Sequence, residues 1–187
     1  IPQEAGLGGG SMNAATILNF LIKKKFIKLN QKKILKISNL IGSDVILGIN
    51  PTSTILTSNN VIKRFFKCSG FYTLLVRPNF GCATKKIYSG VTEFTKSRFN
   101  NPKKNMFSLE FLLKQVNALE KIAFLKYPKL KKIKFFLENS KTPLFVRMTG
   151  SGSVIVAYYR SKRDCELAKV RFKRKFKNYW CNTSKTI

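Results

Sequence analysis

The order of strand-like and helix-like segments limits the fold of this 187-residue chain more than any other feature. Three short apolar runs have the composition of buried strands, and these are residues 72–76, 144–149 and 153–159. Helical apolar spacing recurs between and after them, in residues 84–88, 108–126, 128–138 and 164–176. A short tail is expected to end the chain. This alternation predicts an α+β fold, a two-layer α/β arrangement.

The first part of the chain has a different pattern. Apolar residues recur with helical spacing from Ala14 to Ile22, where Ser11 and Asn13 are available as N-caps. A second helix is expected over residues 30–39, and Val45–Leu47 is expected to form a short buried strand or turn. Residues 51–69 fit a hairpin followed by a connection. We therefore expect two domains, residues 1–69 and residues 70–187.

The charge of the chain narrows the functional classes. Lys and Arg number 36 against 8 acidic residues, giving a formal charge of +28, and histidine is absent. Histidine triads and histidine metal ligands are therefore excluded. A basic module that binds nucleic acid is one interpretation of the charge. However, the cations are 28 Lys and only 8 Arg, and Lys, Asn, Ile and Phe fill 75 of 187 positions. We favour the codon bias of an AT-rich genome, because Arg-poor surfaces lack the bidentate groups that recognise bases.

The cysteines and the apolar runs bear on location. Cys68, Cys82, Cys165 and Cys181 include no pair at the spacing of a zinc or redox motif. Without a signal peptide, they predict a reducing, cytoplasmic environment. No apolar run approaches the roughly 20 residues that span a bilayer, so no membrane partner is expected.

Two glycine-rich segments carry the chemistry. Residues 6–11, Gly-Leu-Gly-Gly-Gly-Ser, enter a helix and predict a phosphate site, because glycine lets backbone amides approach an anion. A flexible linker is the alternative, and the spacing fits neither a Walker A loop nor a Rossmann fingerprint. Residues 149–153, Thr-Gly-Ser-Gly-Ser, would alone be a β-turn. Together, the two segments predict two walls of one phosphate-binding pocket.

Asp44 is the candidate general base. It is one of two aspartates and stands at the edge of an apolar run, where it could accept a proton from a hydroxyl that attacks phosphorus. A capping or turn role is the alternative. The other aspartate, Asp164, is better explained as a charge that favours a helix start.

Four ordered blocks resemble one family of small-molecule kinases. They are Ile1-Pro2 with residues 5–11 and 13–16, Ile41-Gly42-Ser43-Asp44-Val45, Ala83-Thr84-Lys85-Lys86-Ile87-Tyr88, and Arg147-Met148-Thr149-Gly150-Ser151-Gly152-Ser153. Asn117 and Leu119-Glu120 also resemble the family's Asn-Asp-Leu-Glu segment. The resemblance is to the GHMP kinases, and among them to the family of 4-diphosphocytidyl-2-C-methyl-D-erythritol kinases.

The resemblance implies an ATP- and Mg²⁺-dependent phosphotransferase of non-mevalonate isoprenoid (terpenoid) biosynthesis in the bacterial cytoplasm. Its substrate would be a cytidine-diphosphate-linked methylerythritol, phosphorylated on the 2-hydroxyl. The fold would be the remainder of an N-terminal ATP-binding domain followed by a ferredoxin-like C-terminal α/β domain.

The resemblance also implies roles for individual residues. Asp44 would be the base, and Ser11 would lie near the metal. The ATP phosphates would be bound by Pro2, Gln3, Glu4, Ala5, Gly6, Leu7, Gly8, Gly9, Gly10, Ser11, Met12 and Asn13. The substrate would be bound by Thr84, Tyr88, Thr149, Gly150, Ser151, Gly152 and Ser153, with Tyr88 stacking on the cytosine ring.

Several features differ from the family pattern. Glu4 stands where the family has glycine, Met12 replaces a serine, and Ile46 replaces a proline. Members of the family begin with a segment that holds a lysine partner for the catalytic aspartate and a Gly-Tyr-His motif for cytosine, and neither occurs in this sequence. We therefore expect that an N-terminal part is missing and that the chain alone is inactive. It would be an inactive fragment, or half of a split kinase that pairs with a separate N-terminal half or forms a homodimer.

Overall fold

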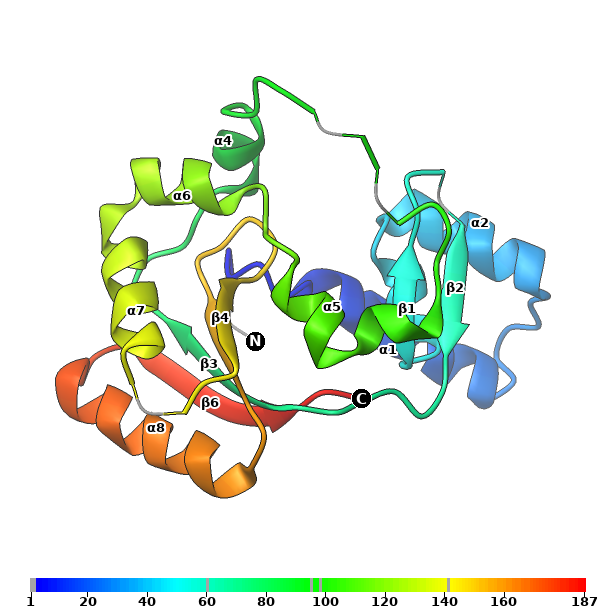
Figure 1. Cartoon of the computed structure of the whole chain (residues 1–187). Coiled ribbons are helices and arrows are strands. Elements are labelled where there is room, and N and C mark those ends of the chain that lie inside the picture. The colour runs from blue at the N-terminus through cyan, green and yellow to red at the C-terminus, as the bar shows by residue number, and fades with distance from the viewer. Residues whose placement is uncertain (1–2, 60, 95, 98, 141) are drawn as a thin grey trace.

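The centre of the molecule is a four-stranded antiparallel sheet. The structure is a computed structural model, which describes residues 3–59, 61–94, 96–97, 99–140 and 142–187. The strands β3 (Tyr72–Arg77), β4 (Phe145–Met148), β5 (Ile155–Tyr159) and β6 (Trp180–Lys185) lie in the order β4-β5-β3-β6. The chain crosses from β3 to β4 through helices that include α7 (Pro128–Glu138), and from β5 to β6 through α8 (Lys162–Lys175), as Figure 1 shows. This order and connectivity are those of a ferredoxin-like fold, which confirms the predicted α+β class.

The two faces of the sheet pack against different parts of the chain. Alternate side chains of β3, such as Leu74 and Val76, are fully buried against the helices α7 and α8. Phe172 of α8 and Leu130 of α7 complete this main core. On the opposite face, Ala5 packs against side chains from β5. The segment around Ala5 is therefore fixed to the sheet.

The described part of residues 3–69 contains three helices and a hairpin. The helices are α1 (Gly9–Lys23), α2 (Gln31–Ile41) and α3 (Val45–Ile49), and the hairpin pairs β1 (Ser53–Leu56) with β2 (Ile62–Phe65). The side chain of Asn30 accepts a hydrogen bond from the backbone N–H of Lys33, which caps α2 where the sequence predicted its start. The hairpin was also predicted correctly. The division into domains at residues 69 and 70 remains a prediction.

Two predicted segments have a different secondary structure. Residues 45–49 form a helix rather than a strand or turn. In this single helical turn the side chains of both Val45 and Ile46 are buried. The expected tail contains β6, whose six residues pair with β3 in continuous register. Polar residues fill β6 because it is an edge strand, and its sequence lacks the apolar alternation of a buried strand.

The predicted helix over residues 108–126 is interrupted. A 3₁₀ turn (η1, Lys104–Phe107) and α5 (Leu109–Leu113) precede a non-helical segment, and α6 (Glu120–Lys126) follows it. Asn117 lies in that segment, where its side chain forms hydrogen bonds with the end of β4. The short helix α4 (Thr84–Tyr88) agrees with its prediction.

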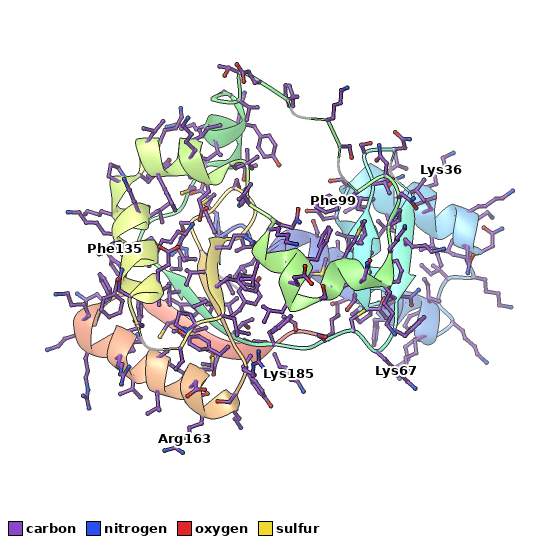
Figure 2. The ribbon with its side chains drawn as sticks, viewed as in Figure 1. Lys36, Lys67, Phe99, Phe135, Arg163 and Lys185 are labelled. Atoms are coloured by element: carbon purple, nitrogen blue, oxygen red, sulfur yellow. The ribbon has the colours of Figure 1, made fainter. Side chains whose placement is uncertain are left out.

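The surface carries its positive charge on many elements. Figure 2 shows the labelled Lys36 of α2, Lys67 after β2 and Arg163 of α8 pointing outward at well-separated edges of the molecule. The four cysteines are free thiols. No described helix combines the length and apolar character that crossing a bilayer requires.

Candidate active site

The first glycine segment has the backbone geometry of an anion-binding loop. Glu4, Gly6 and Gly8 have φ angles of 48°, 68° and 63°, so every second residue lies in the left-handed region. Alternation of this kind turns successive N–H groups toward a common point. The left-handed angle at Glu4 is one that glycine adopts at less cost than any residue with a side chain.

The second segment holds the first in place. Backbone N–H groups of Ser153 and Val154 donate to the carbonyl oxygens of Glu4 (3.2 Å) and Ala5 (3.1 Å). The hydroxyl of Thr149 donates to the carbonyl oxygen of Gly6 over 3.0 Å. A Cβ at Gly6 would lie 2.3 Å from the carbonyl oxygen of Thr149. Gly6 is therefore required by this contact as well as by its φ angle.

Helix α1 presents a free N-terminus beyond this loop. Its N-cap is Gly8, which has no side chain to cap the helix, and its first turn contains no acidic residue. Gly9 and Gly10 belong to the first turn, and the predicted caps Ser11 and Asn13 lie inside the helix. The unpaired N–H groups and the helix dipole of this 15-residue helix favour a bound anion.

One cavity of about 600 Å³ lies between the two segments. Its lining comes from five parts of the chain: the first loop, α1, the start of α3, α4 and the second loop. The lining residues are Gln3, Glu4, Ala5, Gly6, Leu7, Gly8, Gly9, Gly10, Ser11, Asn13, Asp44, Thr84, Tyr88, Gly150 and Ser151. The structure thus brings together segments that are more than 140 residues apart in the sequence.

Asp44 faces this cavity from the N-cap position of α3. Its side chain makes no capping hydrogen bond, and the residue is exposed. Asp44 therefore lies in a turn at an N-cap position without making the capping bond, and its carboxylate is available to a ligand. Asp164 does lie in the first turn of α8, where the hydroxyl of Ser161 donates to its carboxylate over 2.7 Å.

The acceptor side of the cavity is built from α4 and the second loop. The hydroxyls of Thr84 and Ser151 are 3.0 Å apart and share a hydrogen bond. Tyr88, at the end of α4, is 57% exposed. Tyr88 also lines the cavity, so its exposed ring can pack against a ligand there.

Some predicted site residues lie behind the cavity. Gly152 is packed against Cys82, and the buried hydroxyl of Ser153 donates to the carbonyl oxygen of Phe80 over 2.9 Å. Thr149 supports Gly6, as described above, and the sulfur of Met12 lies against Gly48 of α3. Thr149, Gly152, Ser153 and Met12 therefore pack behind the loops and do not line the cavity. Pro2 lies outside the described residues.

The sequence did not indicate that Cys82 supports the first loop from behind. The backbone N–H of Cys82 donates to the carbonyl oxygen of Glu4 over 3.1 Å. Burial, with a smaller effect of the Glu4 charge, raises the pKa of the Cys82 thiol to about 11. Because the contact is made by the backbone, no side-chain pattern could have predicted it.

Comparisons with known proteins show which family the chain belongs to. Residues 91–178 match the family model described as GHMP kinases C terminal. A 4-diphosphocytidyl-2-C-methyl-D-erythritol kinase of Thermodesulfovibrio yellowstonii is 32% identical, over all of this chain and 68% of the relative. The chain belongs to the 4-diphosphocytidyl-2-C-methyl-D-erythritol kinase family. A Pelagibacter ubique member of this family is 56% identical, and the chain spans 66% of that relative's length.

Solved structures show the same fold. The crystal structure of a 4-(cytidine 5'-diphospho)-2C-methyl-D-erythritol kinase matches all of this chain with a TM-score of 0.81 at 21% identity, over 68% of its own length. A homoserine kinase from Cytophaga hutchinsonii matches with a TM-score of 0.71 at 14% identity.

Proposed function

We propose that this chain takes part in the ATP-dependent phosphorylation of the 2-hydroxyl of 4-diphosphocytidyl-2-C-methyl-D-erythritol, in the cytoplasm. The observation that carries the proposal is the single cavity into which both glycine loops, Asp44 and Tyr88 face. The names of the relatives support the choice of substrate. The role of each residue below is part of the proposal.

ATP would place its phosphates at the first loop and the N-terminus of α1. The described lining residues include the carboxylates of Glu4 and Asp44 but no Lys or Arg. Neutralising the phosphates therefore depends on backbone N–H groups, the helix dipole and a metal ion. The lining offers oxygen donors such as the Ser11 hydroxyl, which suit Mg²⁺. The described residues hold no group of three or more His, Cys, Asp or Glu that could bind a metal.

Asp44 would act as the general base. The 2-hydroxyl oxygen of the substrate forms a bond with the γ-phosphorus of ATP while its proton passes to the Asp44 carboxylate. The bond between the γ-phosphorus and the bridging oxygen breaks, and ADP leaves with that oxygen. Mg²⁺, when bound at Ser11, would offset the negative charge of the phosphates. An exposed carboxylate without a capping bond is suited to the proton transfer.

Thr84, Ser151 and Tyr88 would bind the acceptor. The paired hydroxyls of Thr84 and Ser151 can donate to phosphate oxygens of a cytidine diphosphate group. The exposed ring of Tyr88 can stack on the cytosine. Thr84, Ser151 and Tyr88 line the same cavity as the first glycine loop, so a phosphoryl donor and its acceptor could be bound together there.

The proposal includes a protein partner for residues 1–69. Large apolar side chains are exposed there, among them Ile17 and Phe20 of α1 and Leu40 and Ile41 of α2. The occupant that we propose is a polypeptide equivalent to the third of the Pelagibacter relative that this chain does not match. Such a contact would bury the apolar surface. A homodimer on the same surface is the other outcome, which sedimentation of the isolated chain would identify.

The test measures ADP formation from ATP, Mg²⁺ and the substrate. One arm contains the chain alone, and the other also contains the unmatched third of the Pelagibacter relative. Turnover in either arm, with a phosphorylated product seen by ³¹P NMR, supports the proposal. Absence of both turnover and ATP binding in both arms contradicts it and identifies an inactive fragment.

Two variants assign the base in whichever arm is active. Asp44→Asn should lower the rate by about 10²- to 10⁴-fold while ATP binding is retained. Asp164→Asn, in α8 and outside the cavity lining, is the matched control and should keep the rate. A normal rate in Asp44→Asn excludes Asp44 as the base.

A further inference from the structure

The segment between α5 and α6 contacts the second glycine loop. The amide nitrogen of Asn117 donates to the carbonyl oxygens of Met148 (2.9 Å) and Gly150 (2.8 Å). The amide oxygen of Asn117 accepts from the backbone N–H of Leu119 over 3.0 Å. Both N–H groups and the oxygen of this one side chain are therefore used, in a fixed orientation.

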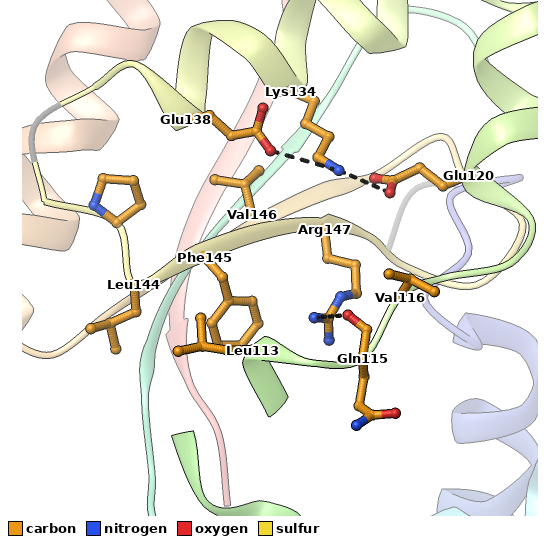
Figure 3. Close-up of a pocket in the computed structure, with 11 residues that line it drawn as sticks. Leu113, Gln115, Val116, Glu120, Lys134, Glu138, Leu144, Phe145, Val146 and Arg147 are labelled. Carbon is orange, nitrogen blue, oxygen red and sulfur yellow. Dashed lines mark hydrogen bonds and ion pairs between the residues drawn. The ribbon is translucent and has the colours of Figure 1, made fainter. Parts of the chain in front are cut away.

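Glu120 holds the same strand end from the next turn. One carboxylate oxygen of Glu120 accepts from the backbone N–H of Met148 over 3.1 Å. The other accepts from Lys134 over 2.9 Å, and Lys134 also pairs with Glu138 at 3.7 Å, as Figure 3 shows. The side chains of Glu120 and Lys134 are only 14% and 21% exposed. Met148 is thus held on both its N–H and its carbonyl oxygen.

The contact continues from Gly150 to the first loop. A Cβ at Gly150 would lie 3.0 Å from the carbonyl oxygen of Gly6 and 3.2 Å from its Cα. The two backbones therefore touch with no side chain between them. Gly150 and Gly6 both line the cavity, whereas Asn117 and Glu120 do not. Any shift of Gly150 would be transmitted directly to the phosphate-binding loop.

We propose that Asn117, supported by Glu120, is a positioning residue that fixes the second loop and, through Gly150, the first loop at Gly6. Its effect on phosphate binding rests on the proposed function, but its effect on loop geometry does not. Asparagine fits this role because it carries two donors and an acceptor. Aspartate would place a charged oxygen against two carbonyl oxygens, and serine would offer one donor for two acceptors.

The test compares Asn117→Asp with a matched control. Amide hydrogen exchange is measured at Ser153 and Val154, whose N–H groups bond to the first loop. Asn117→Asp should speed exchange there by about tenfold relative to amides of β3, because the carbonyl oxygens of Met148 and Gly150 lose their donor and face a carboxylate oxygen instead. The control is Asn139→Asp, which removes a side-chain donor to the carbonyl oxygen of Phe135 at the end of α7. Asn139→Asp should leave exchange at Ser153 and Val154 unchanged.

Exchange separates positioning from a general structural role. Equal acceleration at β3 and at Ser153 means that the variant only destabilises the fold, and this contradicts the proposal. Unchanged exchange at Ser153 and Val154 contradicts it as well. Hydrogen exchange can distinguish these outcomes whether or not the chain binds nucleotide.

Calorimetry of ATP binding in the presence of Mg²⁺ is the second measurement. Asn117→Asp should raise the Kd by about tenfold with unchanged stoichiometry. A lower stoichiometry at unchanged Kd would show a partly unfolded sample and overturn the proposal. If the unmodified chain does not bind ATP under these conditions, hydrogen exchange alone decides the role of Asn117, and the two-arm turnover assay decides the proposed function.

Discussion

At Gly6, the backbone conformation and the neighbouring loop both exclude a side chain. Its φ is 68°, and a Cβ would meet a backbone oxygen at 2.3 Å. We predict that Gly6→Ala lowers the free energy of unfolding by about 2–4 kcal/mol, because the left-handed angle and the steric clash both oppose the methyl group. It should also weaken ATP binding. Denaturant unfolding and calorimetry measure the two effects.

Gly10 provides the control in the same glycine run. A Cβ there meets nothing within 4 Å, and the residue lies in the first turn of α1. Gly10→Ala should therefore leave stability unchanged or raise it by up to about 1 kcal/mol. If both substitutions have the same effect on stability, the close contact between the two loops is wrong.

Two buried thiols make the free energy of unfolding depend on pH in the alkaline range. Burial is the main cause that raises the pKa of Cys82 and of Cys165 from 9.0 to about 11. Between these values the unfolded chain loses thiol protons that the folded chain keeps, so the free energy of unfolding falls as pH rises above about 9. We predict that Tm falls between pH 8 and pH 10.5. The variant Cys82→Ala/Cys165→Ala should show a smaller fall, and an equal fall would contradict this assignment.

At the scale of elements, β6 depends on backbone pairing rather than apolar side chains. The N–H of Thr186 donates to the carbonyl oxygen of Phe71 over 2.9 Å, and strand alternation places the N–H of Ser184 on the same side. Ser184→Pro should therefore cost about 2–3 kcal/mol of unfolding free energy, because it removes a hydrogen bond to β3. Ser184→Ala keeps the N–H and should change stability by less than about 0.5 kcal/mol. Urea unfolding of both variants checks this prediction.

The strands and helices differ in how well the sequence predicts them. Strand β3, hairpin β1–β2 and helix α8 were predicted because apolar spacing, turn residues and caps all indicate them. Strand β6 was missed because an edge strand has no need of an apolar face on both sides. Residues 108–126 were predicted as one continuous helix. Helix propensity depends on neighbouring residues only, so it could not indicate that Asn117 bonds to β4, which is distant from it in the sequence.

The candidate site was predictable to a similar degree. Every described residue that lines the cavity was in the predicted set. Glycine spacing indicated the two loops and the position of Asp44 indicated a base, whereas Gln3, Thr84 and Tyr88 were named only because the sequence resembles the kinase family. The sequence could not show that Thr149 and Ser153 support the loops from behind. That distinction depends on which way each hydroxyl points, and only the packing of the two loops determines it.

At the scale of the whole molecule, the formal charge of +28 is spread over many elements. A dispersed charge of this size attracts any polyanion but supplies no docking geometry. Nonspecific DNA binding is therefore expected at low salt, independent of base sequence. The proposed ATP site differs because it depends on one loop and one helix N-terminus.

Salt dependence distinguishes these two kinds of binding. Affinity for duplex DNA should fall by roughly 10³-fold or more between 50 and 200 mM salt, because several counterions return to the backbone. Affinity for Mg²⁺-ATP should fall by less than about tenfold, since few counterions are displaced. Gly6→Ala should weaken the binding of ATP but not of DNA, because DNA binding depends on positive charge spread over the surface and not on this loop. DNA binding that persists at 200 mM salt and is lost in Gly6→Ala would instead favour a nucleic-acid-binding module that uses this loop.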